Sequence, residues 1–198
     1  MEMDRQRKGR SWGLIVWVCF MLVVVGGVFL SPGFASPPKT LDRSITGPQV
    51  IVNPDSIRLG VAKLMDTIIV FEGSGFKPGD SMFITLVGPN ETKAIVAEGP
   101  IQPDGTFKTE LGKSSINKLT KAMEILRADI VQNEKFEPVV VISQPPIPKG
   151  VYTVKVTSML SPLTAETKLT VKGPTVIDSV MDWIGGLTGK IEHKKENK

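Results

Sequence analysis

The residue types that most often perform catalysis are scarce in this sequence. Its one histidine, His193, lies in a charged C-terminal segment, and its one cysteine, Cys19, lies in an apolar N-terminal stretch. Histidine is the usual general base near neutral pH, and cysteine is a common nucleophile and zinc ligand. A zinc site that combined a single histidine with carboxylates would be atypical. We therefore predict no catalytic residues, no metal site and no cofactor, and we expect that the protein is not an enzyme.

Two further patterns that are functional in other proteins have simpler structural interpretations here. Ser115 and Lys118 match the S-x-x-K string of penicillin-recognising enzymes, but the companion S-D-N and K-T-G strings are absent. A serine at this place favours the capping of a helix instead. Asp66, Asp80 and Asp104 lie near predicted turns, without the dense carboxylate spacing of a calcium loop, and this favours turn formation.

Aromatic and basic residues do not gather in the pattern of a sugar site or a nucleic-acid site. Trp12 and Trp17 precede the predicted folded region and Trp183 follows it, so no tryptophan remains within that region to stack on a sugar. The formal net charge of +4 comes from the two ends of the chain, and no basic face is apparent between them. We expect no nucleic-acid partner and no small-molecule ligand.

The N-terminal part of the chain predicts insertion into a membrane. No charged residue occurs from Ser11 to Pro38, and the run from Leu14 to Leu30 is almost wholly apolar. Leaving such a run in water has a large hydrophobic cost. The excess of positive charge before the run keeps the start of the chain on the cytoplasmic side, so everything after Pro38 is expected outside.

Residues 1–35 are then either a cleaved signal peptide or a retained N-terminal membrane helix. The apolar run is longer than a usual signal-peptide core, which favours an anchor, whereas Gly33-Phe34-Ala35 offers a cleavage site. Both interpretations place the remainder of the chain on the extracytoplasmic side of the cytoplasmic membrane or at the cell surface, anchored or secreted.

The middle of the chain has the pattern of an antiparallel all-β domain. Residues 36–48 are rich in proline, serine and glycine and predict a linker. Residues 49–173 then contain short β-prone runs separated by glycine, proline, asparagine and aspartate. In one of these runs Tyr152, Val154 and Val156 share a face, as in a half-buried strand. We predict strands at 49–52, 56–60, 67–72, 81–87, 93–98, 105–111, 138–143, 150–157 and 165–172.

One segment within this region has helical instead of β periodicity. After Ser114 and Ser115, apolar residues recur every three or four positions, which predicts an inserted amphipathic helix of about four turns near residues 114–132. Its apolar stripe either covers a sheet face or contacts a partner, and both interpretations stay open. The candidate partner-contact residues are Leu119, Met123, Leu126 and Ile130.

The C-terminal tail, residues 174–198, is amphipathic and basic. Its apolar residues have helical spacing and lysines follow them, which is typical of a helix that docks on a membrane surface. Gly185, Gly186 and Gly189 weaken a helix, so a frayed tail or one ordered by a partner is an equal alternative. The candidate membrane or partner contacts are Val180, Met181, Trp183, Ile184 and Leu187.

Three motifs resemble the hairpins and the penultimate strand of bacterial immunoglobulin-like, IPT-type surface domains. They are the GxGF-x-PG turn in residues 72–80, the Pro-Asp-Gly turn in residues 103–107, and the G-x-Y-x-V pattern in residues 148–154. The resemblance covers roughly residues 50–173 and departs from the pattern at residues 113–137. It implies an all-β, immunoglobulin-like antiparallel β-sandwich with one inserted α-helix, in a class of domains used for scaffolding, adhesion or ligand display.

These observations favour a role that depends on surfaces. We expect an exported, membrane-tethered, non-enzymatic structural or protein-interaction module of the cell envelope or surface. Its expected partners are other envelope or surface proteins, and it contacts the membrane through the N-terminal helix. The alternative is an accessory domain that binds a ligand, either polysaccharide or calcium, and the least favoured hypothesis is an unrecognised enzyme.

Overall fold

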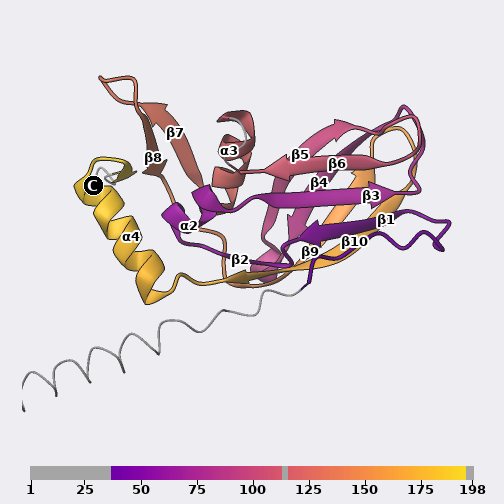
Figure 1. The fold of residues 1–198 in the computed structure, drawn as a ribbon, viewed down its shortest axis with the longest axis horizontal. Coiled ribbons are helices and arrows are strands. Elements are labelled where there is room, and N and C mark those ends of the chain that lie inside the picture. The colour runs from indigo at the N-terminus through magenta and orange to yellow at the C-terminus, as the bar shows by residue number, and fades with distance from the viewer. Residues whose placement is uncertain (1–36, 113–115, 195–198) are drawn as a thin grey trace, which may run out of the picture. The chain divides into compact units, whose positions relative to one another are not determined.

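The computed structural model describes residues 37–112 and 116–194, and these are mostly β-structure with a few short helices (Figure 1). Within them the strands form three sheets. The first sheet has the order β1-β3-β6 and the second has the order β2-β10-β9-β4-β5, and together they make a sandwich-like fold. The strands of these two sheets are β1 (Gln49–Asn53), β2 (Ser56–Arg58), β3 (Ile69–Ser74), β4 (Ser81–Val87), β5 (Lys93–Pro100), β6 (Phe107–Leu111), β9 (Gly150–Ser158) and β10 (Thr164–Lys172).

Alternation of apolar and polar residues builds the two facing layers. Buried residues occur at every second position of β3, β4 and most of β9, because successive side chains of a strand point to opposite faces. β1 contacts β10, and β5 contacts β6, so the sheets meet along both edges of the sandwich. The prediction of a mostly β, sandwich-like fold is therefore confirmed. The largest side chains that it buries completely include Phe71, Ile69, Ile84, Leu86 and Tyr152.

The segment before β1 is bound to that strand by two side-chain amides. The Asn53 amide accepts a hydrogen bond from the Lys39 backbone at 2.8 Å and donates one to the Lys39 carbonyl at 2.9 Å. The Gln49 amide makes the same reciprocal pair with Asp42, at 2.9 and 2.7 Å. Lys39 also lies 3.5 Å from the carboxylate of Asp55. The predicted linker is thus held against the fold from Lys39 onward.

The predicted helix near 114–132 is wrong in its second half. The structure has α3 (Ile116–Met123), a 3-10 turn η2 (Glu124–Leu126) and then a strand, β7 (Ala128–Gln132). Arg127 takes a left-handed conformation, with φ of 52°, which ends the helical path. Beyond it, Ile130 pairs with Val140 of β8 (Pro138–Ile142), so pairing with the next strand of the chain replaces the helix.

A third sheet contains the strand that was expected at 138–143. Its order is β11-β8-β7, and β11 (Ile191–His193) runs parallel to β8. β8 therefore belongs to this separate sheet and not to the sandwich. Helix α4 (Val176–Leu187) precedes β11, and the six-residue helix α2 (Val61–Asp66) links β2 to β3. Figure 1 shows α2, α4 and the β7–β8 hairpin gathered at one end of the sandwich.

The predicted N-terminal membrane segment, residues 1–35, lies outside the described residues. Among residues 37–112 and 116–194, no helix is long and apolar enough to cross a membrane.

Candidate functional site

The strongest candidate for a functional surface is helix α4, which is held in place from its first turn. Thr175 forms a capping box with Asp178: the Thr175 hydroxyl accepts a hydrogen bond from the Asp178 backbone at 3.2 Å, and the Asp178 carboxylate accepts one from the Thr175 backbone at 2.8 Å. Such a cap satisfies amide groups that otherwise lack partners at a helix start. The glycines near its end do not prevent the helix, which continues to Leu187.

The side of α4 that faces the rest of the protein is acidic. Asp178 is 6% exposed, and one of its oxygens lies 3.9 Å from the Arg58 guanidinium. Asp182, one turn later, accepts hydrogen bonds from the first two amides of α2, those of Val61 at 3.0 Å and Ala62 at 2.9 Å. Carboxylates at a helix N-terminus are favoured by its unpaired amides and its dipole. Polar contacts therefore fix α4 to α2.

The apolar side of α4 faces outward. Its exposed fractions run from 43% for Ile184 to 81% for Val176. From Val176 to Thr188 the sequence has only two charged residues, Asp178 and Asp182, so the outward face is uncharged. A surface helix of a soluble protein usually has the opposite arrangement, with its apolar stripe on the core. We call this the α4 face; it consists of Val176, Ile177, Val180, Met181, Trp183, Ile184 and Leu187.

Grooves lie along both flanks of the helix. One, with a volume of about 550 Å³, runs between α4 and β8 and has Ala62 and Met65 of α2 among its lining residues. The other, of about 480 Å³, lies between α4 and the third sheet and is lined by Trp183, Leu187 and Ile142. Met181 and Ile184 of the α4 face line the first groove, and Trp183 and Leu187 line the second, so the apolar face continues into both grooves.

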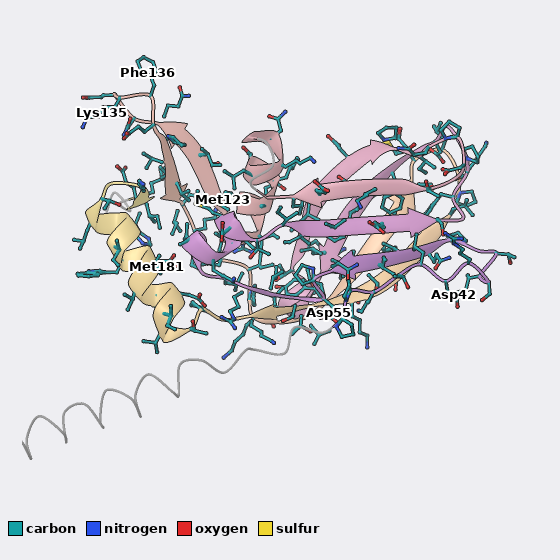
Figure 2. All side chains as sticks on the ribbon, viewed as in Figure 1. Asp42, Asp55, Met123, Lys135, Phe136 and Met181 are labelled. Atoms are coloured by element: carbon teal, nitrogen blue, oxygen red, sulfur yellow. The ribbon has the colours of Figure 1, made fainter. Side chains whose placement is uncertain are left out.

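A further exposed apolar side chain, Phe136, lies at the same end of the molecule. It occupies the tip of the β7–β8 hairpin and is 81% exposed, and Figure 2 shows it at the end that also carries Met181 of α4. Asn133 organises this tip because its side-chain oxygen accepts hydrogen bonds from the backbones of Lys135 and Glu137, each at 2.9 Å. The ring is thus presented by an ordered loop.

The two sets of contact residues predicted from the sequence differ in their exposure to solvent. Met123 and Leu126 are completely buried, and Leu119 and Ile130 pack against the same core. Met123 and Leu126 therefore belong to the interior, and Leu119 and Ile130 are partly buried against it. All five residues predicted in the tail are exposed and belong to the α4 face: Val180, Met181, Trp183, Ile184 and Leu187.

Two of the carboxylates that sequence inspection singled out, Asp80 and Asp104, stabilise turns, whereas Asp66 is the last residue of helix α2. Asp80 is 2% exposed; burial raises the pKa of its carboxyl, but hydrogen bonds from the Ser161 hydroxyl and the backbones of Leu160 and Ser81 outweigh this and leave the pKa lowered. The pKa of Asp104 is lowered by hydrogen bonds from the Thr106 hydroxyl and backbone.

The residues considered for metal binding and catalysis in the sequence do not come together in the described part of the chain. No group of three or more histidine, cysteine, aspartate or glutamate side chains there is arranged to hold a metal ion. His193 is exposed on β11. Ser115, the serine of the S-x-x-K string, lies outside the described residues.

Sequence reasoning missed the acidic side of α4 and the exposed ring of Phe136. The spacing of Thr175 and Asp178 is that of a capping box, which could have identified the start of α4. Asp178 and Asp182 are separated by one helical turn, so their common face could also have been inferred. The position of Phe136 at a hairpin tip had no such signal, because β7 itself was not predicted.

Comparisons with known proteins give only a weak structural similarity. No family model matches the chain, and no curated protein matches it. Among solved structures, macromomycin is similar: it is 15% identical, the similarity covers 63% of this chain and 99% of that one, and the TM-score is 0.37. At this identity and TM-score, the likeness supports no statement about function.

Proposed function

We propose that this protein is an exported, non-enzymatic structural or interaction module of a cell envelope or surface, tethered to the membrane by residues 1–35. The observation that carries this proposal is the α4 face. Water-exposed apolar area costs about 25 cal/mol per Å², and soluble monomers rarely gather many large apolar side chains on one surface unless a contact covers it. The protein therefore acts by surface contact at the end that carries α4.

The use of the buried carboxylates supports a role without catalysis. Burial raises the pKa of Asp178, but hydrogen bonds from the Thr175 backbone and hydroxyl, together with the charges of Arg58 and Lys63, leave it lowered. Asp80 has its oxygens occupied by a turn in the same way. An active-site acid or base needs free access to substrate, whereas these two groups are engaged in holding the fold.

The finer fold assignment that we propose is immunoglobulin-like. Tyr152 is completely buried, and its hydroxyl donates a hydrogen bond to the carbonyl of Pro148 at 2.8 Å. Immunoglobulin-like domains commonly contain a tyrosine whose hydroxyl bonds to the backbone a few residues upstream. Gly75 and Gly79 of the GxGF-x-PG turn have φ of 77° and 75°, a region that favours glycine. Both features support the resemblance of residues 148–154 and 72–80.

Site-directed labelling of cysteine tests the export and the tether. In a chain with Cys19→Ser, one variant carries Leu160→Cys, at an 80% exposed site of the sandwich, and a matched variant carries Lys8→Cys before the apolar run. In intact cells of a bacterial host, a membrane-impermeant maleimide should label only the cysteine at position 160. After cell lysis and an alkaline wash, the chain should stay with the membranes.

Two results would count against the proposal. Labelling of position 8 but not of position 160 in intact cells would place the fold on the cytoplasmic side and refute export. Release of the chain into the medium, or its loss from washed membranes, would refute the tether while leaving export in place, as expected for a cleaved signal peptide.

A further inference from the structure

We propose that the α4 face docks on the lipid bilayer that holds the N-terminal segment, so that the protein contacts its membrane twice. This inference rests on the tether in the proposed function and names the partner of the α4 face. It assigns the face to a lipid surface of mixed zwitterionic and anionic headgroups.

The first argument is the path of the chain between the tether and α4. The chain is fixed to the fold at Lys39, through its hydrogen bonds to Asn53 and its ion pair with Asp55, which Figure 2 labels. β2 begins directly after Asp55 and ends at Arg58, which pairs with Asp178 of α4. A strand of three residues is about 10 Å long. The point where the tether joins the fold is therefore close to the start of α4.

The reach of the chain before Lys39 is short as well. Eight residues separate the end of the apolar run at Leu30 from Lys39. A chain of that length spans at most about 30 Å when fully extended. If residues 14–30 occupy a bilayer, this short connection keeps the fold near the membrane surface. The effective concentration of lipid around the α4 face is then high, which favours binding of the face to the bilayer.

The second argument is the chemistry of the face. Helices that lie in a membrane interface bury apolar and aromatic side chains and place lysines beside the headgroups. Trp183 is 64% exposed on the α4 face, and tryptophan favours the headgroup level of a bilayer. Exposed lysines flank the helix in the sequence, Lys172 before it and Lys190 and Lys194 after it, and basic residues next to an interfacial helix attract anionic lipids.

The third argument is the inward direction of the acidic groups. Asp178 and Asp182 would repel an anionic surface if they shared the outward side of α4. Instead Asp178 is buried beside Arg58, and Asp182 is bound to the first amides of α2. The helix therefore meets the bilayer already folded and without a negative charge on its contact side, so binding requires no coupled helix formation.

Fluorescence of Trp183 in the reconstituted full chain tests the proposal. Trp12→Phe and Trp17→Phe leave Trp183 as the single tryptophan. This chain is reconstituted into vesicles of phosphatidylcholine and phosphatidylglycerol, with or without brominated acyl chains. We expect the emission to be quenched by the brominated lipid and protected from an aqueous quencher. The double substitution Ile184→Asp and Leu187→Asp should abolish both effects.

A matched control uses another exposed apolar pair, which lies far from α4. Met159 and Leu160, in the β9–β10 connection, are 56% and 80% exposed. Met159→Asp with Leu160→Asp adds the same charge, and it should leave the quenching by brominated lipid unchanged. Because all four substituted side chains are exposed, circular dichroism should show the same folded spectrum for both double variants.

Three outcomes overturn the inference, and they are distinguishable. If the chain floats with the vesicles while the aqueous quencher reaches Trp183, the docking is refuted and the tether stands. If Trp183 is protected from the aqueous quencher but not quenched by brominated lipid, the face is covered by protein, such as a second copy of the chain, and the lipid assignment is wrong. If the chain does not float with the vesicles, the tether of the proposed function fails, and the docking fails with it.

Discussion

Replacement of Asp182 by alanine should both destabilise the fold and release α4. The Asp182 carboxylate is bonded to the amides of Val61 and Ala62, and the residue at the N-cap of α2, Gly60, supplies no side-chain cap of its own. Loss of a capping side chain costs about 1 kcal/mol, and loss of a negative charge at a helix N-terminus costs about 0.5 kcal/mol more. Allowing for partial burial of the two amides, we expect a loss of about 2 kcal/mol.

The measurement is thermal unfolding of a chain that comprises residues 37–198, which contain the whole described core. For a domain of this size, about 2 kcal/mol corresponds to a decrease in Tm of roughly 4–8 °C. Asp182→Asn keeps one acceptor oxygen and should lose about half as much. Hydrogen exchange of residues 176–187 should accelerate in parallel, because few apolar contacts hold α4 to the fold.

The control is Asp129→Ala, at an exposed carboxylate on β7, which should change stability by no more than about 0.5 kcal/mol. If Asp182→Ala has the same Tm as this control and the hydrogen exchange of α4 is unchanged, the polar contacts between α4 and α2 do not stabilise the protein. The inverted orientation of the helix would then need another cause.

Three further predictions concern the sandwich. Gly88→Ala should lower the free energy of unfolding by about 3 kcal/mol in urea denaturation, because the new methyl group would overlap the buried ring of Tyr152. Gly173→Ala, which has open space around it, should be nearly neutral in the same assay. Tyr152→Phe should cost about 1 kcal/mol in the same assay, by removing the hydrogen bond to the carbonyl of Pro148, and an unchanged midpoint would show that the bond adds nothing. Because the pKa of Asp80 is lowered in the fold, its carboxylate stabilises the protein above about pH 4, and this stabilisation is lost as the pH falls through the lowered pKa. Asp80→Asn should therefore reduce the Tm at pH 7 and make the Tm fall less steeply in acid. Parallel curves of Tm against pH for the two chains would contradict this prediction.

The strands of the sandwich could be predicted because the signal for them is local. Tyr152, Val154 and Val156 alternate with polar residues, and this period of two fixes which side of β9 is buried wherever one face meets a core. The turns between strands depend on glycine and proline in the same local way. Strand bounds differ from the predicted ones by a few residues, as for β6, which begins at Phe107 instead of residue 105.

Residues 124–132 could not be predicted because their structure depends on pairing with β8, whereas the start of α3 and the strand at 138–143 were predicted. Leu126 and Ile130 have helical spacing, but the segment changes direction at Arg127 and continues as a strand. The stability of β7 comes from hydrogen bonding to β8, and β8 in turn pairs with β11 near the C-terminus. A periodicity read within one window contains no information about such partners, so tertiary context overrides it.

For helix α4, the sequence determined the two sides and the tertiary structure determined their direction. A period of 3.6 residues places Asp178 and Asp182 on one side and the apolar residues on the other, whatever the surroundings. Only the folded arrangement brings the free amides of α2 and the guanidinium of Arg58 to the acidic side. Those groups bind carboxylates more strongly than apolar side chains, and so the apolar side of the helix faces away from the protein.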